Sequence, residues 1–196
     1  YYVIAGPAGP YFKSGPAPVS IWLSEEYSRA GKGGTGAAKT GGNYAASLLP
    51  QSVAFENECD QVVFLDQDGN VEELGGMNVV FVYKDGTLVT PESPSILEGI
   101  TRDSILQLAR DRGHKVEGRS ISLAQWRADV ASGEIVEVFA CGTAAVVTPI
   151  GLLKGKDFFD EQPKGELALS LRGELTDIQY GRREDVHGWL TRLDAE

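Results

Sequence analysis

The chain contains one glycine-rich segment that carries a lysine and ends in a tyrosine. Residues 33–44 read Gly-Gly-Thr-Gly-Ala-Ala-Lys-Thr-Gly-Gly-Asn-Tyr, which places Lys39 among five glycines and Tyr44 five residues after it. Glycine lets the backbone approach a ligand closely and adopt positive φ. A lysine in such a segment is either a partner for phosphate or an amine that captures a carbonyl carbon.

Two phosphate-binding motifs match this segment only in part. The P-loop pattern G-x-x-x-x-G-K-[ST] aligns with residues 33–40, but Ala38 stands where its last glycine belongs. The dinucleotide pattern G-x-G-x-x-G fits residues 31–36 by letter, yet it requires a buried strand directly before it. The polar residues 25–29 do not form such a strand, so both motifs are disfavoured.

A third chemistry for Lys39 is a Schiff base with pyridoxal 5′-phosphate (PLP). PLP needs an amine, a carboxylate for its ring nitrogen, a donor to its phenolate oxygen and a cradle for its phosphate. Lys39 supplies the amine, Tyr44 could donate to the phenolate oxygen, and Glu73 could pair with the ring nitrogen. Residues 99–101 (Gly-Ile-Thr) and 142–144 (Gly-Thr-Ala) offer backbone N–H groups and hydroxyls for phosphate. Each residue also has an ordinary explanation, since an isolated Glu is usually solvated and a Thr at a helix start usually caps it.

The segments around these residues predict interleaved helices and strands, and therefore a mixed α/β (α+β) fold. Apolar and β-branched runs predict strands at 1–5, 19–23, 61–65, 71–74, 78–83, 87–90, 115–121, 135–140 and 146–150. Helical periodicity predicts helices at 43–58, 102–112, 122–132 and 167–179. Thr101 and Ser122 are the expected N-caps of the second and third helices. Turn residues at 66–70 and 84–86 predict an antiparallel meander across residues 61–90.

The bulk composition excludes several classes of protein. With 196 residues, 42% of them hydrophobic, the chain suits one domain or one domain with a short appendage. A net charge of −10 without a basic cluster argues against nucleic-acid partners, and no run of about 18 apolar residues predicts a membrane span. Cys59 and Cys141 are too few for a disulfide framework, which favours the cytoplasm. The first residues lack a signal-peptide pattern and an initiator methionine, so we expect the chain to begin inside a longer protein.

Four blocks, in order along the chain, resemble the branched-chain amino acid aminotransferases, which are fold-type IV PLP enzymes. The blocks are residues 33–44, 72–78 (Glu-Glu-Leu-Gly-Gly-Met-Asn), 99–102 (Gly-Ile-Thr-Arg) and 141–145 (Cys-Gly-Thr-Ala-Ala). Residues 175–181 and 187–189 are similar to the C-terminal end of the family. The resemblance implies that residues 1–196 form the large PLP-binding domain, a mixed-strand pseudo-barrel flanked by helices. It also implies that the small N-terminal domain of the family is absent from the chain.

The resemblance implies a role for each matching residue. Lys39 would bind PLP covalently and shuttle a proton, Glu73 would hold the ring nitrogen, and Tyr44 would hold the phenolate oxygen. The other cofactor-binding residues would be Ile100, Thr101, Thr143 and Arg29. The substrate-binding residues would be Tyr11, Gly76, Gly142, Thr143 and Ala144, and Phe12 follows Tyr11 between two predicted turns.

The implied activity is PLP-dependent transamination between a branched-chain L-amino acid (Leu, Ile or Val) and 2-oxoglutarate, giving a branched-chain 2-oxo acid and glutamate. The implied setting is a cytoplasmic homodimer. Two other enzymes of the same fold, D-amino acid aminotransferase and aminodeoxychorismate lyase, are alternatives. A further alternative is a cofactor-domain fragment that is catalytically incompetent.

Overall fold

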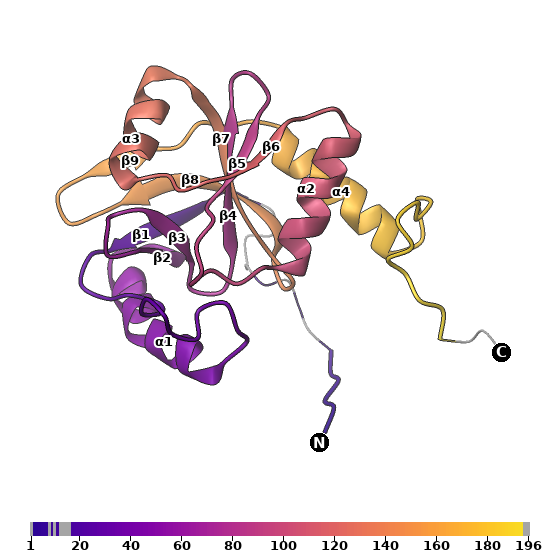
Figure 1. Cartoon of the computed structure of the whole chain (residues 1–196), viewed down its shortest axis with the longest axis horizontal. Coiled ribbons are helices and arrows are strands. Elements are labelled where there is room, and N and C mark those ends of the chain that lie inside the picture. Colours follow the sequence, from indigo (N-terminus) through magenta and orange to yellow (C-terminus); the bar gives the residue numbers. More distant parts are fainter. Residues whose placement is uncertain (1, 8, 10, 12–16, 194–196) are drawn as a thin grey trace.

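The structure, a computed structural model that describes residues 2–7, 9, 11 and 17–193, is built on a strongly curled sheet (Figure 1). The described strands are β1 (Val19–Ser24), β2 (Gln61–Leu65), β3 (Val71–Leu74), β4 (Asn78–Tyr83), β5 (Leu88–Thr90), β6 (Val116–Gly118), β7 (Ile135–Gly142), β8 (Val146–Lys154) and β9 (Phe159–Glu161). They follow the order β3-β2-β1-β8-β7-β4-β5-β6, and β9 pairs with β8 beside that path. The pairs β1–β2, β1–β8 and β5–β6 are parallel and the others are antiparallel. The mixed α/β class and the mixed sheet predicted from the sequence are confirmed.

Strand β8 joins the two halves of the sheet, because its two ends pair with different strands. Residues 146–149 pair with β7, whereas residues 150–154 pair with β1. Between them the register against β1 shifts by one residue at Gly151, where an added Cβ would lie 2.9 Å from the Cβ of Pro18. A bulge bends its strand and increases the local twist. The bend in β8 therefore turns a long sheet into a half-barrel.

The connection between β3 and β4 shows how far the sheet curls. The strands β2, β1, β8 and β7 lie between β3 and β4 in the sheet, yet residues 75–77 alone join them in the chain. The Leu74 N–H donates to the Met77 carbonyl over 2.8 Å, so the chain turns tightly across the open side of the curl. The predicted hairpins at 61–74 and 78–90 are confirmed. A continuous meander is wrong, because β3 and β4 are not neighbours in the described sheet.

Helices α1 (Gly41–Glu56), α2 (Ile100–Asp111), α3 (Leu123–Ser132) and α4 (Leu167–Gln179) surround the sheet, with α2 and α4 side by side (Figure 1). Strand β4 is buried on both faces, which is typical of a central strand. Val79 and Phe81 pack in the cluster that contains Trp126 of α3, while Val80 and Val82 pack against α2 and α4. The start of β4, where the candidate site lies, is therefore held firmly. No helix in the described part of the chain is long and apolar enough to cross a membrane.

Three local predictions are wrong. Residues 2–5 form no strand and are exposed, because β-propensity without a neighbouring strand does not make one, and Tyr1 lies outside the described residues. Strand β6 covers residues 116–118 only. The N-cap of α2 is Gly99, with extended φ −69° and ψ 129°, so Thr101 lies inside the first turn. The Ser122 cap is confirmed, since its Oγ accepts the Gln125 N–H over 3.1 Å.

Candidate active site

A cavity of about 250 Å³ lies where β3, β4 and β7 meet the loops before α1 and α2. Predicted site residues from separate segments line it together, among them Lys39, Tyr44, Glu73, Thr101 and Thr143. The other lining residues are Arg29, Gly75, Gly76, Met77, Asn78, Leu97, Glu98, Gly99, Ile100, Cys141 and Gly142. The curl of the sheet thus gathers all four sequence blocks around one space.

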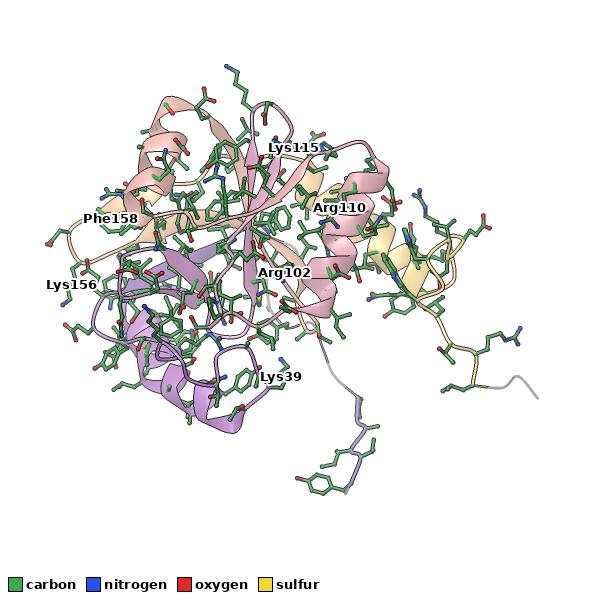
Figure 2. The ribbon with its side chains drawn as sticks, viewed as in Figure 1. Lys39, Arg102, Arg110, Lys115, Lys156 and Phe158 are labelled. Carbon is green, nitrogen blue, oxygen red and sulfur yellow. The ribbon has the colours of Figure 1, made fainter. Side chains whose placement is uncertain are left out.

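Asn43 holds the loop that carries Lys39. Its Nδ2 donates to the carbonyls of Thr35 (2.8 Å) and Ala38 (3.0 Å), and the Thr35 hydroxyl donates to its Oδ1 over 2.9 Å. Asn43 is buried in the first turn of α1, so the loop and the helix form one unit. The exposed side chain of Lys39 lies beside α1, with its Nζ 5.2 Å from the centre of the Tyr44 ring (Figure 2). Its amine is presented to the cavity next to the tyrosine, as the spacing suggested.

Glu73 is the buried acceptor of the site. Its Oε1 accepts the Leu97 N–H over 2.9 Å and lies 2.7 Å from Nη2 of Arg29, and its Oε2 accepts Nδ2 of Asn78 over 3.1 Å. Burial raises the pKa of Glu73 to about 7, although the Leu97 N–H and the Arg29 guanidinium both favour the ionised form. A carboxyl with this proton affinity can exchange a proton near neutral pH.

Arg29 links Glu73 to the lysine loop. Besides the carboxylate, its Nη2 contacts the carbonyls of Gly36 (2.7 Å) and Ser95 (2.5 Å). The side chains of Arg29 and Glu73 are each 4% exposed. At Gly36 an added Cβ would lie 2.1 Å from the Ser95 carbonyl oxygen, so this close approach requires glycine. Arg29 lines the cavity, as expected of a cofactor-binding residue, but its described contacts are to Glu73 and to backbone.

The two predicted phosphate cradles both border the cavity. Gly99, Ile100 and Thr101 form the N-terminus of α2, where backbone N–H groups of the first turn and the helix dipole favour an anion. Gly142 is the last residue of β7, and Thr143 follows it in the turn to β8. The site therefore has a titratable carboxyl at Glu73 and anion-binding N–H groups at its edges.

The predicted substrate-binding residues divide into two groups. Gly76, Gly142 and Thr143 line the cavity, whereas Tyr11 and Ala144 are not among its lining residues. The Tyr11 hydroxyl lies 3.5 Å from Nε2 of Gln61, and its side chain is half exposed. Phe12 lies outside the described residues.

Sequence reasoning assigned no role to Asn78, Leu97 or Cys141, which also line the cavity. Asn78 was within a matching block, but Leu97 acts through its backbone, so its side chain carried no signal. Burial raises the pKa of the Cys141 thiol to about 12, so this sulfur stays uncharged in the cavity wall.

Comparison with known proteins places these features in a family. The amino-transferase class IV family matches residues 2–153. The chain is 57% identical over 204 residues to the branched-chain-amino-acid aminotransferase of Mycolicibacterium smegmatis, covering 99% of the chain and 55% of that relative. Identity to the protein of the same name from Mycobacterium tuberculosis strain H37Rv is 58% over 203 residues, covering 98% and 55%. The chain thus spans about half the length of the curated relatives it matches.

Solved structures agree with the sequence relatives. The branched-chain amino acid aminotransferase of Thermobaculum terrenum, in its PLP-form, superposes with a TM-score of 0.75 at 32% identity, covering 89% of this chain and 55% of that one. The enzyme of Thermoproteus uzoniensis with norvaline gives a TM-score of 0.82 at 29% identity, covering 96% and 59%. The half-barrel described above is therefore the fold of the fold-type IV enzymes.

Proposed function

The chain belongs to the amino-transferase class IV family, and from this premise we propose that it is the PLP-binding large domain, residues 1–196, of a branched-chain amino acid aminotransferase. One observation carries the proposal: Lys39, Tyr44, Glu73 and the N-terminus of α2 border a single cavity. The relatives named above support the substrate class.

The residues present fit PLP chemically. Lys39 offers an amine for the aldehyde, and the buried Glu73 carboxyl offers an acceptor for a protonated ring nitrogen. The first turn of α2 and the turn at Thr143 offer N–H groups for the phosphate. The Thermobaculum terrenum relative was solved in its PLP-form, which supports the same cofactor here.

When bound, PLP supplies an aldehyde that takes the amino group of the substrate and a ring that withdraws electrons from its α-carbon. In the proposed mechanism the Nζ of Lys39 would carry a proton between the α-carbon of the substrate and C4′ of the cofactor, the carbon that bears the aldehyde. The Tyr44 hydroxyl would donate to the phenolate oxygen, and Glu73 would hold the proton on the ring nitrogen. The N–H groups at Ile100, Thr101 and Thr143 would hold the phosphate.

The remaining cofactor and substrate assignments are proposals of the same kind. Arg29 acts on the cofactor through Glu73, because that carboxylate is its described side-chain partner and its other described contacts are to backbone carbonyls. Gly142 and Thr143, which line the cavity, would orient the substrate carboxylate, and Gly76 would border the substrate side chain. The lining of the cavity gives no support to the assignments of Ala144 and Tyr11. The reaction transfers the amino group of Leu, Ile or Val to 2-oxoglutarate, giving a branched-chain 2-oxo acid and glutamate.

Substitution of the lysine tests the assignment. The chain is incubated with PLP, reduced with borohydride and mapped by peptide mass spectrometry, which locates any trapped lysine imine. We expect the label on Lys39, and its loss in Lys39→Ala. Lys32→Ala is the matched control, because Lys32 lies in the same loop but not among the lining residues of this cavity. Equal labelling of Lys39→Ala and the parent would refute the proposal.

An amino-donor assay tests the substrate. L-Leucine with 2-oxoglutarate should support glutamate formation, whereas activity on D-alanine or aminodeoxychorismate alone would favour the alternative enzymes of the same fold. No turnover despite labelling of Lys39 would identify the chain as a cofactor-binding part that is catalytically incompetent by itself. That outcome is compatible with its coverage of 55% of the relatives.

We also propose a homodimer in the cytoplasm. Support for a partner copy comes from α1, where Leu48, Leu49 and Phe55 are 72%, 57% and 62% exposed. Apolar side chains gathered on one helix are typical of an interface. Sedimentation of the parent and of Leu48→Glu tests this, since a dimer through α1 should dissociate in the variant.

A further inference from the structure

The Glu73 carboxylate has two oxygens with different surroundings, and this difference identifies a residue that positions it. Oε1 already has two partners, the Leu97 N–H at 2.9 Å and the Arg29 Nη2 at 2.7 Å. Oε2 has one partner in the described part of the chain, Nδ2 of Asn78 at 3.1 Å. A carboxylate oxygen can accept a second hydrogen bond. The oxygen that remains available to a ligand is therefore the one that Asn78 holds.

The Asn78 amide is fixed in one orientation by its other contacts. Nδ2 also donates to the Leu97 carbonyl over 3.0 Å, so both of its N–H groups are used. A flipped amide would place Oδ1 against the Glu73 carboxylate and the Leu97 carbonyl. These three oxygens would then face one another without a donated hydrogen between them. On the other side, Oδ1 lies against Gly99, where an added Cβ would come within 2.2 Å of it. The amide is locked, and Asn78 itself is only 5% exposed.

Asn78 lies between the two ends of the cavity. On one side it bonds Glu73, the acceptor at the buried end, and on the other it contacts Leu97 and Gly99, which lead into the N-terminus of α2. Its own backbone is fixed because it begins the central strand β4, opposite Cys141 of β7. One side chain therefore sets the position of the carboxylate relative to the anion-binding turn.

We propose that Asn78 is a positioning residue, which aims Oε2 of Glu73 into the cavity and fixes its separation from the N-terminus of α2. This rests on the proposed function for its consequence in catalysis, but the contacts belong to the protein alone. A ligand with a protonated ring nitrogen at one end and a phosphate at the other matches this arrangement. The remaining charged groups near Glu73 are Arg29, Glu72 and Arg102, with the Cys141 thiol, and none has a described hydrogen bond to Asn78.

The first test uses the chain without cofactor. The Glu73 carboxyl is titrated by ¹³C NMR in the parent, Asn78→Ala and Thr90→Val. Loss of a donor to the ionised form should raise the Glu73 midpoint in Asn78→Ala by about one pH unit above its value near 7. Thr90→Val is the matched control, since it removes a buried hydrogen bond to the Val79 carbonyl outside the cavity lining and should leave the midpoint unchanged. An unchanged midpoint in Asn78→Ala would overturn the proposal.

The second test measures PLP affinity by fluorescence titration of the same three proteins and of Asn78→Asp. We expect affinity to fall about 10-fold or more in Asn78→Ala and Asn78→Asp, and to stay within about twofold in Thr90→Val. Equal affinity of parent and Asn78 variants would refute the positioning role while leaving the proposed function intact. A parent chain that binds no PLP would count against the proposed function, and the titration would still decide the role of Asn78.

Discussion

For the buried pair of Arg29 and Glu73 we predict that the stability lost on substituting Arg29 depends on pH. Both side chains are 4% exposed, and the pKa of Glu73 is raised to about 7 from the ordinary value of 4.5. Raising the folded-state pKa of a carboxyl stabilises the fold fully below pH 4.5, and this stabilisation is lost as pH rises through 7. The difference of 2.5 between 7 and 4.5 corresponds to about 3 kcal/mol.

Arg29→Met should therefore cost more at pH 8.5 than at pH 5.5. At pH 5.5 Glu73 is already protonated, so the loss is limited to the contacts with the Gly36 and Ser95 carbonyls, about 1–3 kcal/mol. At pH 8.5 the parent holds an ionised Glu73 beside Arg29, whereas the variant must keep the proton. Keeping it costs at most 1.36 kcal/mol for each pH unit above 7, so the added loss is about 2 kcal/mol.

Urea unfolding at the two pH values, followed by tryptophan fluorescence, measures both losses. Arg29→Met combined with Glu73→Gln should lose the pH-dependent part, since no carboxyl remains to titrate. Arg127→Met is the surface control, because its pair with Asp160 is exposed and should contribute about 0–1 kcal/mol. If Arg29→Met lowers the unfolding free energy equally at pH 5.5 and 8.5, Glu73 does not titrate in this range and the prediction is refuted.

Two further substitutions test the backbone around the site. Gly36→Ala should lower the unfolding free energy by about 1–3 kcal/mol, because its Cβ would clash with the Ser95 carbonyl. Gly42→Ala, in open space within α1, should not lower it, and a loss there equal to that of Gly36→Ala would contradict the steric argument. Ser122→Ala should cost about 1 kcal/mol through loss of the α3 cap. Ser104→Ala, at a half-buried serine inside α2, is its control in the same melts, and equal costs would argue against the cap.

Sequence patterns among neighbouring residues were enough to predict most of the helices and strands. The helix over 167–179 was predicted at its observed bounds because periodicity along the chain marks a buried face. The cap at Ser122 was predicted because a serine stands at the start of a predicted helix. The failures are non-local: residues 2–5 have β-propensity without a neighbouring strand, and β3 and β4 are joined by a tight turn without pairing.

The chemistry of the candidate site was largely readable in the sequence, but its assembly was not. Residue types made Lys39, Tyr44 and Glu73 candidates for an amine, a phenol and a carboxylate, and the resemblance of their sequence blocks to the aminotransferases gave each a predicted role. Asn78 escaped notice because an amide gains a role only from the groups that it touches. The pairing of Arg29 with Glu73 likewise depends on loops that meet only in the folded protein.

The sequence by itself determined which functional groups the chain carries and which segments form its helices and hairpins, since both depend on residues close together in the chain. The tertiary structure decided which of those groups share a cavity, because that depends on the bend in β8 and on β1 lying between β2 and β8. It also decided the proton affinity of Glu73, because loss of water around a carboxyl is a property of everything packed against it.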